Sequence, residues 1–160
     1  MRDHTEPSRI AGELRKAVRG PAWHGPAFLE LLADVPPPLA ARRGVPGAHS
    51  IWEITLHVVT WLGVVGERID GLHRDVSDDE DWPTVVDESP AAWQQLLDRA
   101  GAAADRLATL IEQFPDDGLD PRLPGAAATG PSAYATLHGC VQHVLYHAGQ
   151  IAILKKGSPA

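Results

Sequence analysis

The chain has 160 residues, of which 44% are hydrophobic and 22% are charged, and its formal net charge is −7. This composition is typical of an ordinary globular protein, and its length most simply predicts one domain, residues 1–160. The acidic balance argues against a nucleic-acid partner, and no apolar segment reaches the roughly 18 residues that a membrane span requires.

The first helical segment is expected from about Glu6 to Asp34, with an interruption at "RGPAW". Gly20 and Pro21 end its first piece, and Pro21 can begin the next piece because proline fits the first turn of a helix. The prolines at 36–38 end the segment. A loop, "LAARRGVPGAH", is expected to follow them.

The second helix begins with "SIWE", which places Ser50 at the N-cap and Glu53 three residues later, as in a capping box. Gly71 is the expected stop. Between these positions, apolar side chains recur at helical spacing: Ile51, Ile54, Val58, Trp61, Leu62 and Val65. The next stretch, "RDVSDDEDWP", is acidic and expected to be exposed, with Trp82 as its apolar exception.

The third helix has Ser89 as its N-cap and Pro90 in its first turn, and it is expected to end near Phe114. The stretch "PDDGLDPRLPGAAATGPS" is rich in proline and glycine and predicts a long crossover loop. A fourth helix is expected from about Ser132 to Lys156.

Little in the chain is typical of a strand. Four capped segments, each with an apolar stripe, predict an all-α four-helix bundle of long antiparallel helices. The two longer connections, after the second and third helices, favour a topology other than simple up-and-down.

Histidines mark the candidate site. In "QHVLYHAGQIAILKK", His143 and His147 are four residues apart and therefore share one helical face. This is the spacing of two metal ligands supplied by one helix. His57, in the middle of the apolar "WEITLHVVTWL", is the best third ligand, because a buried imidazole needs a partner. Each of the three can instead be a hydrogen-bonded core residue.

The other histidines compete poorly for this site. His138 lies about 140° around the helix from His143 and can hardly share a metal with it. His49 is expected to make a loop or cap hydrogen bond, and His24, in "PAWHGP", is a candidate for lining the open end of the bundle. Two others are expected to be exposed: His4 and His73.

Three further side chains near the histidines are candidates for a role at the site. Cys140 is about 10.5 Å from His147 along the helix axis, so it is expected to be a small core residue rather than a ligand or a nucleophile. Gln150 is expected either to contact a ligand or to lie at the mouth of the bundle. Glu53 lies one turn before His57 and could accept a proton there, although its capping box explains it without chemistry.

Two stretches, "HSIWEITLHVVTWL" and "LHGCVQHVLYHAGQIAILKK", resemble the DinB/YfiT-like superfamily of metal-binding four-helix bundles. The similarity covers nearly the whole chain, and its most specific part is H-x3-H-x-G-Q-I, from His143 to Ile151. The resemblance implies a left-handed topology with a long crossover. It also implies nickel or zinc held by His57, His143 and His147, with open positions for water.

Members of that family with known activity mainly use a low-molecular-weight thiol, such as bacillithiol or mycothiol, to open an electrophile or to isomerise a ring-cleavage product. The chain lacks the C-terminal domain of the mycothiol-dependent maleylpyruvate isomerases, so their activity is not expected here. Family habit also favours a homodimer.

Three hypotheses follow for the function. The first is a metal-dependent S-transferase in detoxification or stress, acting on a small molecule in the cytoplasm, since the N-terminus lacks the apolar segment of a secretory signal. The second is a hydrolase that uses metal-bound hydroxide, and the third is a non-catalytic metal or small-ligand binding protein. Metal binding is expected to weaken below about pH 6, near the ordinary pKa of histidine.

Overall fold

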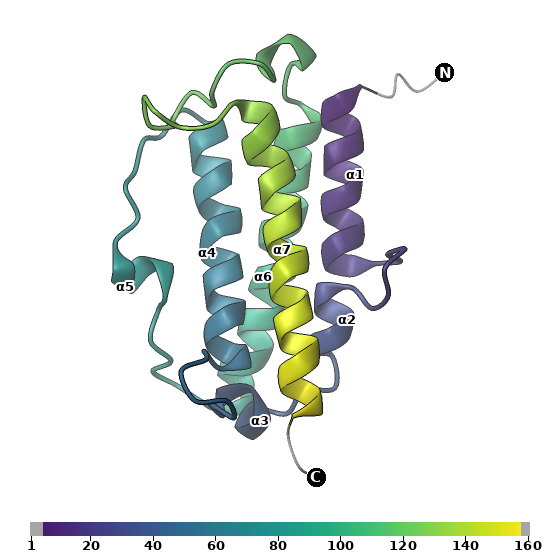
Figure 1. Cartoon of the computed structure of the whole chain (residues 1–160), viewed down its shortest axis with the longest axis vertical. Helices are drawn as coiled ribbons and strands as arrows, with labels where there is room; N and C mark the ends of the chain where they lie inside the picture. The colour runs from purple at the N-terminus through teal and green to yellow at the C-terminus, as the bar shows by residue number, and fades with distance from the viewer. Residues whose placement is uncertain (1–4, 158–160) are drawn as a thin grey trace.

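The computed structural model describes residues 5–157. Its four long helices are α1 (Glu6–Arg19), α4 (Ile51–Ile69), α6 (Pro90–Glu112) and α7 (Ala133–Lys156), which form a bundle (Figure 1). The short elements are α2 (Phe28–Leu32), α3 (Pro37–Ala41), α5 (Asp78–Asp81) and the 3-10 helix η1 (Asp116–Gly118). The described residues contain no strand, so the prediction of an all-α fold is confirmed.

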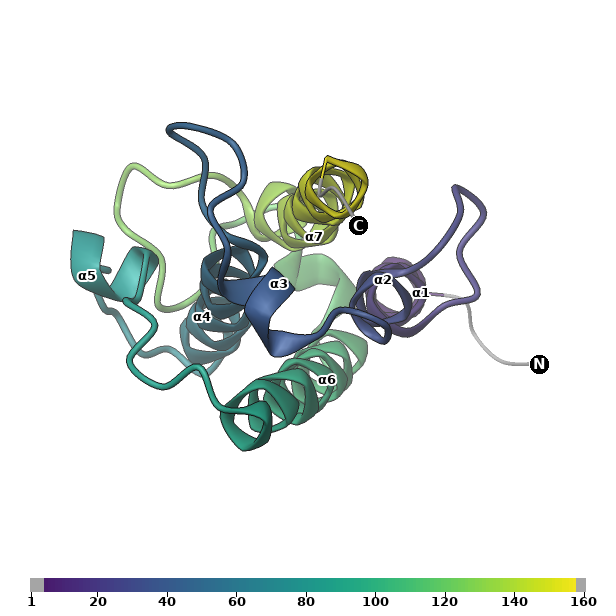
Figure 2. The same ribbon diagram turned by 90° about the horizontal axis from the view of Figure 1, so that it is seen from below.

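The long helices stand at the corners of a square (Figure 2). Helix α6 packs against both α1 and α4, and α7 packs against the same two helices from the other side. Helices α6 and α7 therefore lie diagonally across the bundle, and the α4–α7 pair forms a seam of its own.

Helices α4 and α6 are parallel, as are α1 and α7 (Figure 1), so the prediction of antiparallel helices throughout was wrong for these two pairs. Trp52 and Trp93, both in the first turn of their helices, have ring centroids 4.9 Å apart. The crossover of residues 70–89 is long enough to return the chain along the whole bundle, and it carries α5 beside α4 (Figure 1). The expectation of a topology other than up-and-down is thus confirmed. The connection after α6 crosses only one end of the bundle.

The core is apolar on the α6 side of the bundle. Small residues of α6 are buried there and allow its neighbours to approach closely, and larger ones fill the remaining space. The buried side chains of α6 are Trp93, Leu96, Ala100, Ala104, Leu107, Ala108 and Ile111.

Two boundaries near the N-terminus differ from the sequence-based expectation. Helix α1 ends at Gly20, which has φ of 78°, and Pro21 lies in the following loop instead of beginning a helix. Helix α2 begins after Ala27, whose backbone N–H donates to Glu30 Oε2 at 2.7 Å. The prolines at 36–38 do not start a plain loop, because Pro37 takes the first position of α3, where a backbone N–H is not needed.

The other long helices begin where their caps predict. Ser50, Ser89 and Ser132 each accept a hydrogen bond from a backbone N–H in the first turn of α4, α6 and α7. None of the helices within residues 5–157 is both long and apolar enough to cross a membrane.

Candidate metal centre

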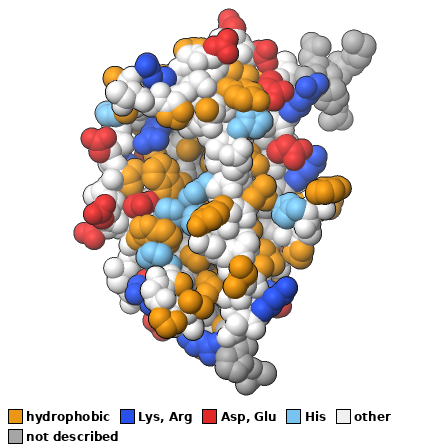
Figure 3. Space-filling model, in the orientation of Figure 1, with side chains coloured by type: hydrophobic (Ala, Val, Ile, Leu, Met, Phe, Trp, Pro, Cys, Tyr) orange, Lys and Arg blue, Asp and Glu red, His pale blue; other side chains and the backbone are white. Residues whose placement is uncertain are grey.

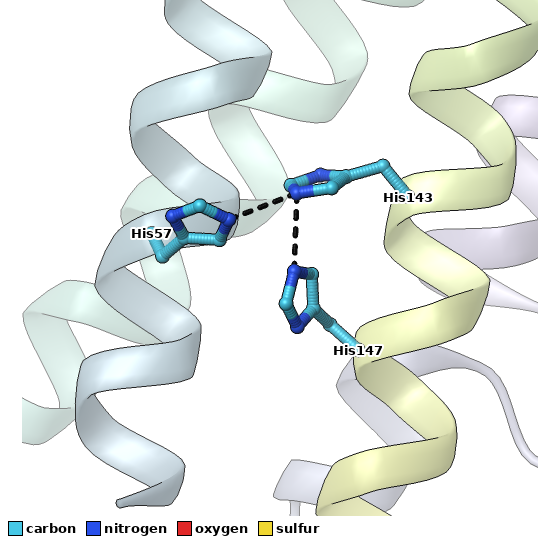
Figure 4. A group of neighbouring side chains, drawn as sticks. All are labelled: His57, His143 and His147. Atoms are coloured by element: carbon cyan, nitrogen blue, oxygen red, sulfur yellow. Dashed lines mark hydrogen bonds between the residues drawn. The ribbon is translucent and has the colours of Figure 1, made fainter. Parts of the chain in front are cut away.

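Three imidazoles meet in the α4–α7 seam. His57 comes from the middle of α4, and His143 and His147 come from successive turns of α7 (Figure 4). His143 Nε2 lies 2.9 Å from His57 Nε2 and 3.0 Å from His147 Nε2. His57 and His147 are buried, with 6% and 4% of their surface exposed, and His143 is half-buried. The histidines selected from the sequence therefore lie together, positioned to bind a metal ion.

Hydrogen bonds on the far side of two rings orient them toward this point. His57 Nδ1 lies 2.7 Å from the backbone carbonyl oxygen of Asp81, and His147 Nδ1 lies 2.7 Å from Gln150 Oε1. Because these oxygens can only accept, both Nδ1 atoms donate, and in neutral rings the lone pairs of Nε2 face the cluster. Gln150 therefore contacts a candidate ligand, which is one of the two positions that the sequence left open for it.

The three donors fit a divalent ion. Two nitrogens at right angles, each about 2.1 Å from one ion, are about 3.0 Å apart, which matches the two Nε2 separations of His143. A proton placed between two Nε2 atoms can bridge only that pair, whereas a metal ion can accept the lone pairs of all three Nε2 atoms. The group consists of imidazoles alone, a donor set that suits nickel or zinc better than magnesium or calcium.

Burial disfavours the charged forms of His143 and His147. Burial first, and then the neighbouring His147 and His57, lower the pKa of His143 to about 4, although the carboxylate of Asp81 opposes this shift. The pKa of His147 is also lowered, first by burial, although its bond to Gln150 opposes the change. Protons should therefore compete with a metal for His143 at a lower pH than a free imidazole would predict.

The crossover supplies a cover for His57. The Trp82 ring stacks on His57 with centroids 3.9 Å apart, and its ring also stacks on His49 at 3.6 Å. Trp61 Nε1 donates to Asp81 Oδ1 at 2.6 Å, and the same oxygen lies 3.1 Å from His57 Nδ1. Asp81 and Trp82 thus fix the position of His57 from outside α4.

This role of the crossover was not expected from its sequence, which suggested only a solvated acidic stretch. One local signal was present, because Ser77 and Glu80 form a capping box at the start of α5. That signal predicts a helical turn just before Trp82. It does not predict that this turn packs on the middle of α4.

Two cavities border the histidine cluster from opposite sides. The first, of about 350 Å³, is lined by His57 and His143 together with Trp61, Val65, Arg68, Asp81, Thr136, Gly139 and Cys140. The second, of about 360 Å³, is lined by His147 with Gln150, His49, Ile54, Trp82, Tyr146, Ile153 and neighbouring residues. Histidine atoms reach the surface in the middle of this face, beside the acidic edge that α5 forms (Figure 3). Small molecules can therefore approach the imidazoles from either cavity.

Two other candidates do not belong to the site. The carboxylate of Glu53 accepts from the backbone N–H of Ser50 at 2.8 Å and pairs with Arg43, so it serves the helix cap. Burial opposes its ionisation, but these bonds hold the pKa of Glu53 below its usual range. His24, the candidate for lining the open end of the bundle, is exposed and lines a separate cavity between α1 and α7, away from the histidine cluster.

The remaining histidines also lie away from the cluster. His138 turns toward Glu6, with its Nε2 3.4 Å from Glu6 Oε1, as its rotation around α7 predicts. His73 is exposed, and its Nδ1 lies 3.0 Å from the carbonyl oxygen of Gly125. His4 lies outside the described residues.

Cys140 is buried, as expected of a small core residue, although it also lines the first cavity. Burial raises the pKa of its thiol to about 12. The thiol is therefore protonated at neutral pH, and this makes it a poor nucleophile and a poor ligand.

Comparison with known proteins agrees with this arrangement. The sequence profile of the DinB superfamily matches residues 22–151, a stretch that includes His57, His143 and His147. No curated protein and no solved structure matches the chain. The match covers well over half of the sequence, and the resemblance stated from the sequence is confirmed.

Proposed function

This chain belongs to the DinB superfamily, and we propose that it binds one nickel or zinc ion and transfers a low-molecular-weight thiol to an electrophile. The ligands in this proposal are His57, His143 and His147. The observation that carries it is the convergence of three Nε2 atoms at a point that two separate cavities border.

Hydrogen bonds orient two of the candidate ligands, His57 and His147, for a metal ion. Asp81 and Gln150 fix the two buried rings in the orientation and tautomer that a metal requires, so binding needs little rearrangement. When bound, a divalent ion with only neutral ligands keeps its full charge and lowers the pKa of a thiol toward neutrality. The nucleophile in this proposal is an exogenous thiol, since Cys140 stays protonated.

The two cavities favour a reaction with two organic substrates. One substrate can occupy the space beside His57 and His143 while the other approaches from the side of His147. In the transfer, the thiol sulfur forms a bond to an electrophilic carbon, the leaving group departs with the electron pair of the broken bond, and the thiol proton is released. A hydrolase would need only one cavity, because its second substrate is water. A binding protein would need only the cavity that holds its ligand.

The test combines metal analysis with a thiol screen. The protein reconstituted with nickel or zinc is assayed with an alkyl halide or an epoxide, with and without added thiols. Consumption of the electrophile should require both the metal and a thiol, and it should be lost in His57→Ala but kept in His138→Ala. Metal-dependent turnover without any thiol would favour the hydrolase instead, and metal binding without turnover would favour a binding protein. A role in detoxification or stress and a homodimeric state stay predictions.

A further inference from the structure

A half-buried arginine lies in the first cavity without an acidic partner. Arg68 is in the last turn of α4, and its Nε is buried with no hydrogen-bond partner. Within residues 5–157, no carboxylate forms an ion pair with it. The other described basic side chains that lack an acidic partner are all exposed: Arg42, Arg99, Arg106, Arg122 and Lys156. Partial burial of a cation that has no acidic partner is unfavourable.

The guanidinium of Arg68 is close to the histidine cluster. Its Cζ lies 5.6 Å from the centroid of the Trp61 ring, and that ring lies 6.3 Å from the ring of His143. One indole therefore separates the cation from the imidazoles, within the same cavity. The acidic side chain in this cavity, Asp81, already accepts from Trp61 and is close to His57 Nδ1.

We propose that the first cavity binds a small organic molecule with a carboxylate, which pairs with Arg68 while the other end of the molecule reaches the three imidazoles. A guanidinium presents two parallel N–H donors to a carboxylate, which makes this pair stronger and more selective than a contact with a neutral group. The second cavity has no lysine or arginine among its lining residues, so it takes the uncharged substrate. The identity of the reacting end rests on the proposed function, whereas the pairing with Arg68 does not.

The first experiment uses metal-free protein and a matched pair of probes, hexanoate and hexan-1-ol. Binding is followed by the NMR shift of the Trp61 indole N–H, assigned with a Trp61→Phe variant. Hexanoate should bind at least about tenfold more tightly than the alcohol, as a charge-assisted pair predicts. This preference should disappear in Arg68→Gln and should persist in Arg106→Gln, which removes the same charge from an exposed position on α6.

An Arg68→Lys variant provides a second test that does not depend on the folding of Arg68→Gln. It keeps the charge but not the paired donors, so its preference should be smaller than that of the parent and larger than that of Arg68→Gln. Equal affinity of the parent for the two probes, or an undiminished preference in both Arg68 variants, would overturn the proposal.

A second experiment uses cobalt-loaded protein and asks which substrate carries the carboxylate. If the carboxylate belongs to the thiol, 6-mercaptohexanoate should bind more tightly than both hexanoate and 6-mercaptohexan-1-ol and should change the cobalt absorption spectrum. If it belongs to the electrophile, 6-mercaptohexanoate and hexanoate should bind alike. A protein that takes up no metal yet prefers hexanoate through Arg68 would contradict the proposed function and leave this inference standing.

Discussion

The α6 side of the bundle and the α4–α7 seam are built on different principles. Along α6, tryptophan, leucine, isoleucine and alanine side chains pack into an apolar core. Across the α4–α7 seam, three imidazoles take the place of apolar side chains, and a cavity borders them on each side. The α6 side thus contributes apolar packing, whereas the α4–α7 seam holds the candidate metal ligands. Changes on one side should therefore leave the other largely intact.

The largest effect is expected from replacing a candidate ligand. His57→Ala, His143→Ala or His147→Ala should remove most of the bound metal, because only two donors remain. The circular dichroism of each variant should stay helical, since the apolar core on the α6 side is unchanged. Elemental analysis measures the metal content, with His138→Ala as the control from the same helix. A His57→Ala protein that holds as much metal as the parent would contradict the three-histidine site.

A mutation that creates a cavity in the apolar core on the α6 side should lower stability and leave the metal content unchanged. Leu107, which is 1% exposed, lies in the core, and Leu107→Ala should lower the free energy of unfolding by about 2–5 kcal/mol. The metal content of the folded variant should equal that of the parent. Urea unfolding measures the stability, and Leu72→Ala, at a position 60% exposed, should change it by no more than about 0.5 kcal/mol. Loss of metal from folded Leu107→Ala would show that the two sides are coupled.

The contact of Asp81 and Trp82 with His57 gives a third test. Asp81→Ala removes the oxygen that lies beside both Trp61 Nε1 and His57 Nδ1, so the ring of His57 should be less well oriented. Metal affinity should fall by about 10- to 100-fold, less than when a ligand is removed. Competition with a chelator measures this affinity. Asp79→Ala, an exposed position in the same short helix, should leave it unchanged.

The pH at which metal is released tests whether burial in the α4–α7 seam lowers the pKa of His143. The pKa of His143 is lowered to about 4, so the folded metal-free protein binds fewer protons there than an unfolded chain does between about pH 6.5 and 4. Protonation of His143 should therefore displace the metal only as the pH falls toward 4. Dialysis at a series of pH values followed by elemental analysis tests this. Half-release above pH 6 would show that protonation of His143 does not set the pH of metal release.

The smallest effect is expected at Cys140. Its thiol has a pKa of about 12, so iodoacetamide at pH 8 should modify it slowly in the folded protein and rapidly in urea. The same raised pKa disfavours ionisation in the folded state, so stability should decline as the pH rises above about 9. Cys140→Ala should leave the metal content unchanged. If it removes the metal, then Cys140 and His143 form the ligand pair on α7.

Local features of the sequence were enough to predict the long helices and two of the three clustered histidines, His143 and His147. The caps at Ser50, Ser89 and Ser132 act within one turn of the residues they cap, so they can be recognised without a fold. The i, i+4 spacing of His143 and His147 is equally local, because helical geometry alone brings their rings to one face. His57 could be added because a histidine in an apolar helical stripe must face the core.

The tertiary structure decided the contacts that join distant segments. The parallel arrangement of α4 and α6, the bond from His57 to the Asp81 carbonyl and the orientation of Arg68 toward the cavity all depend on how residues 70–89 and the bundle pack together. A loop of this length can close in many ways at similar entropic cost, so its sequence does not specify which residue meets α4. The short-range geometry of the helices therefore determined which candidate ligands the protein offers, and long-range packing determined what orients their rings and which cavities they face.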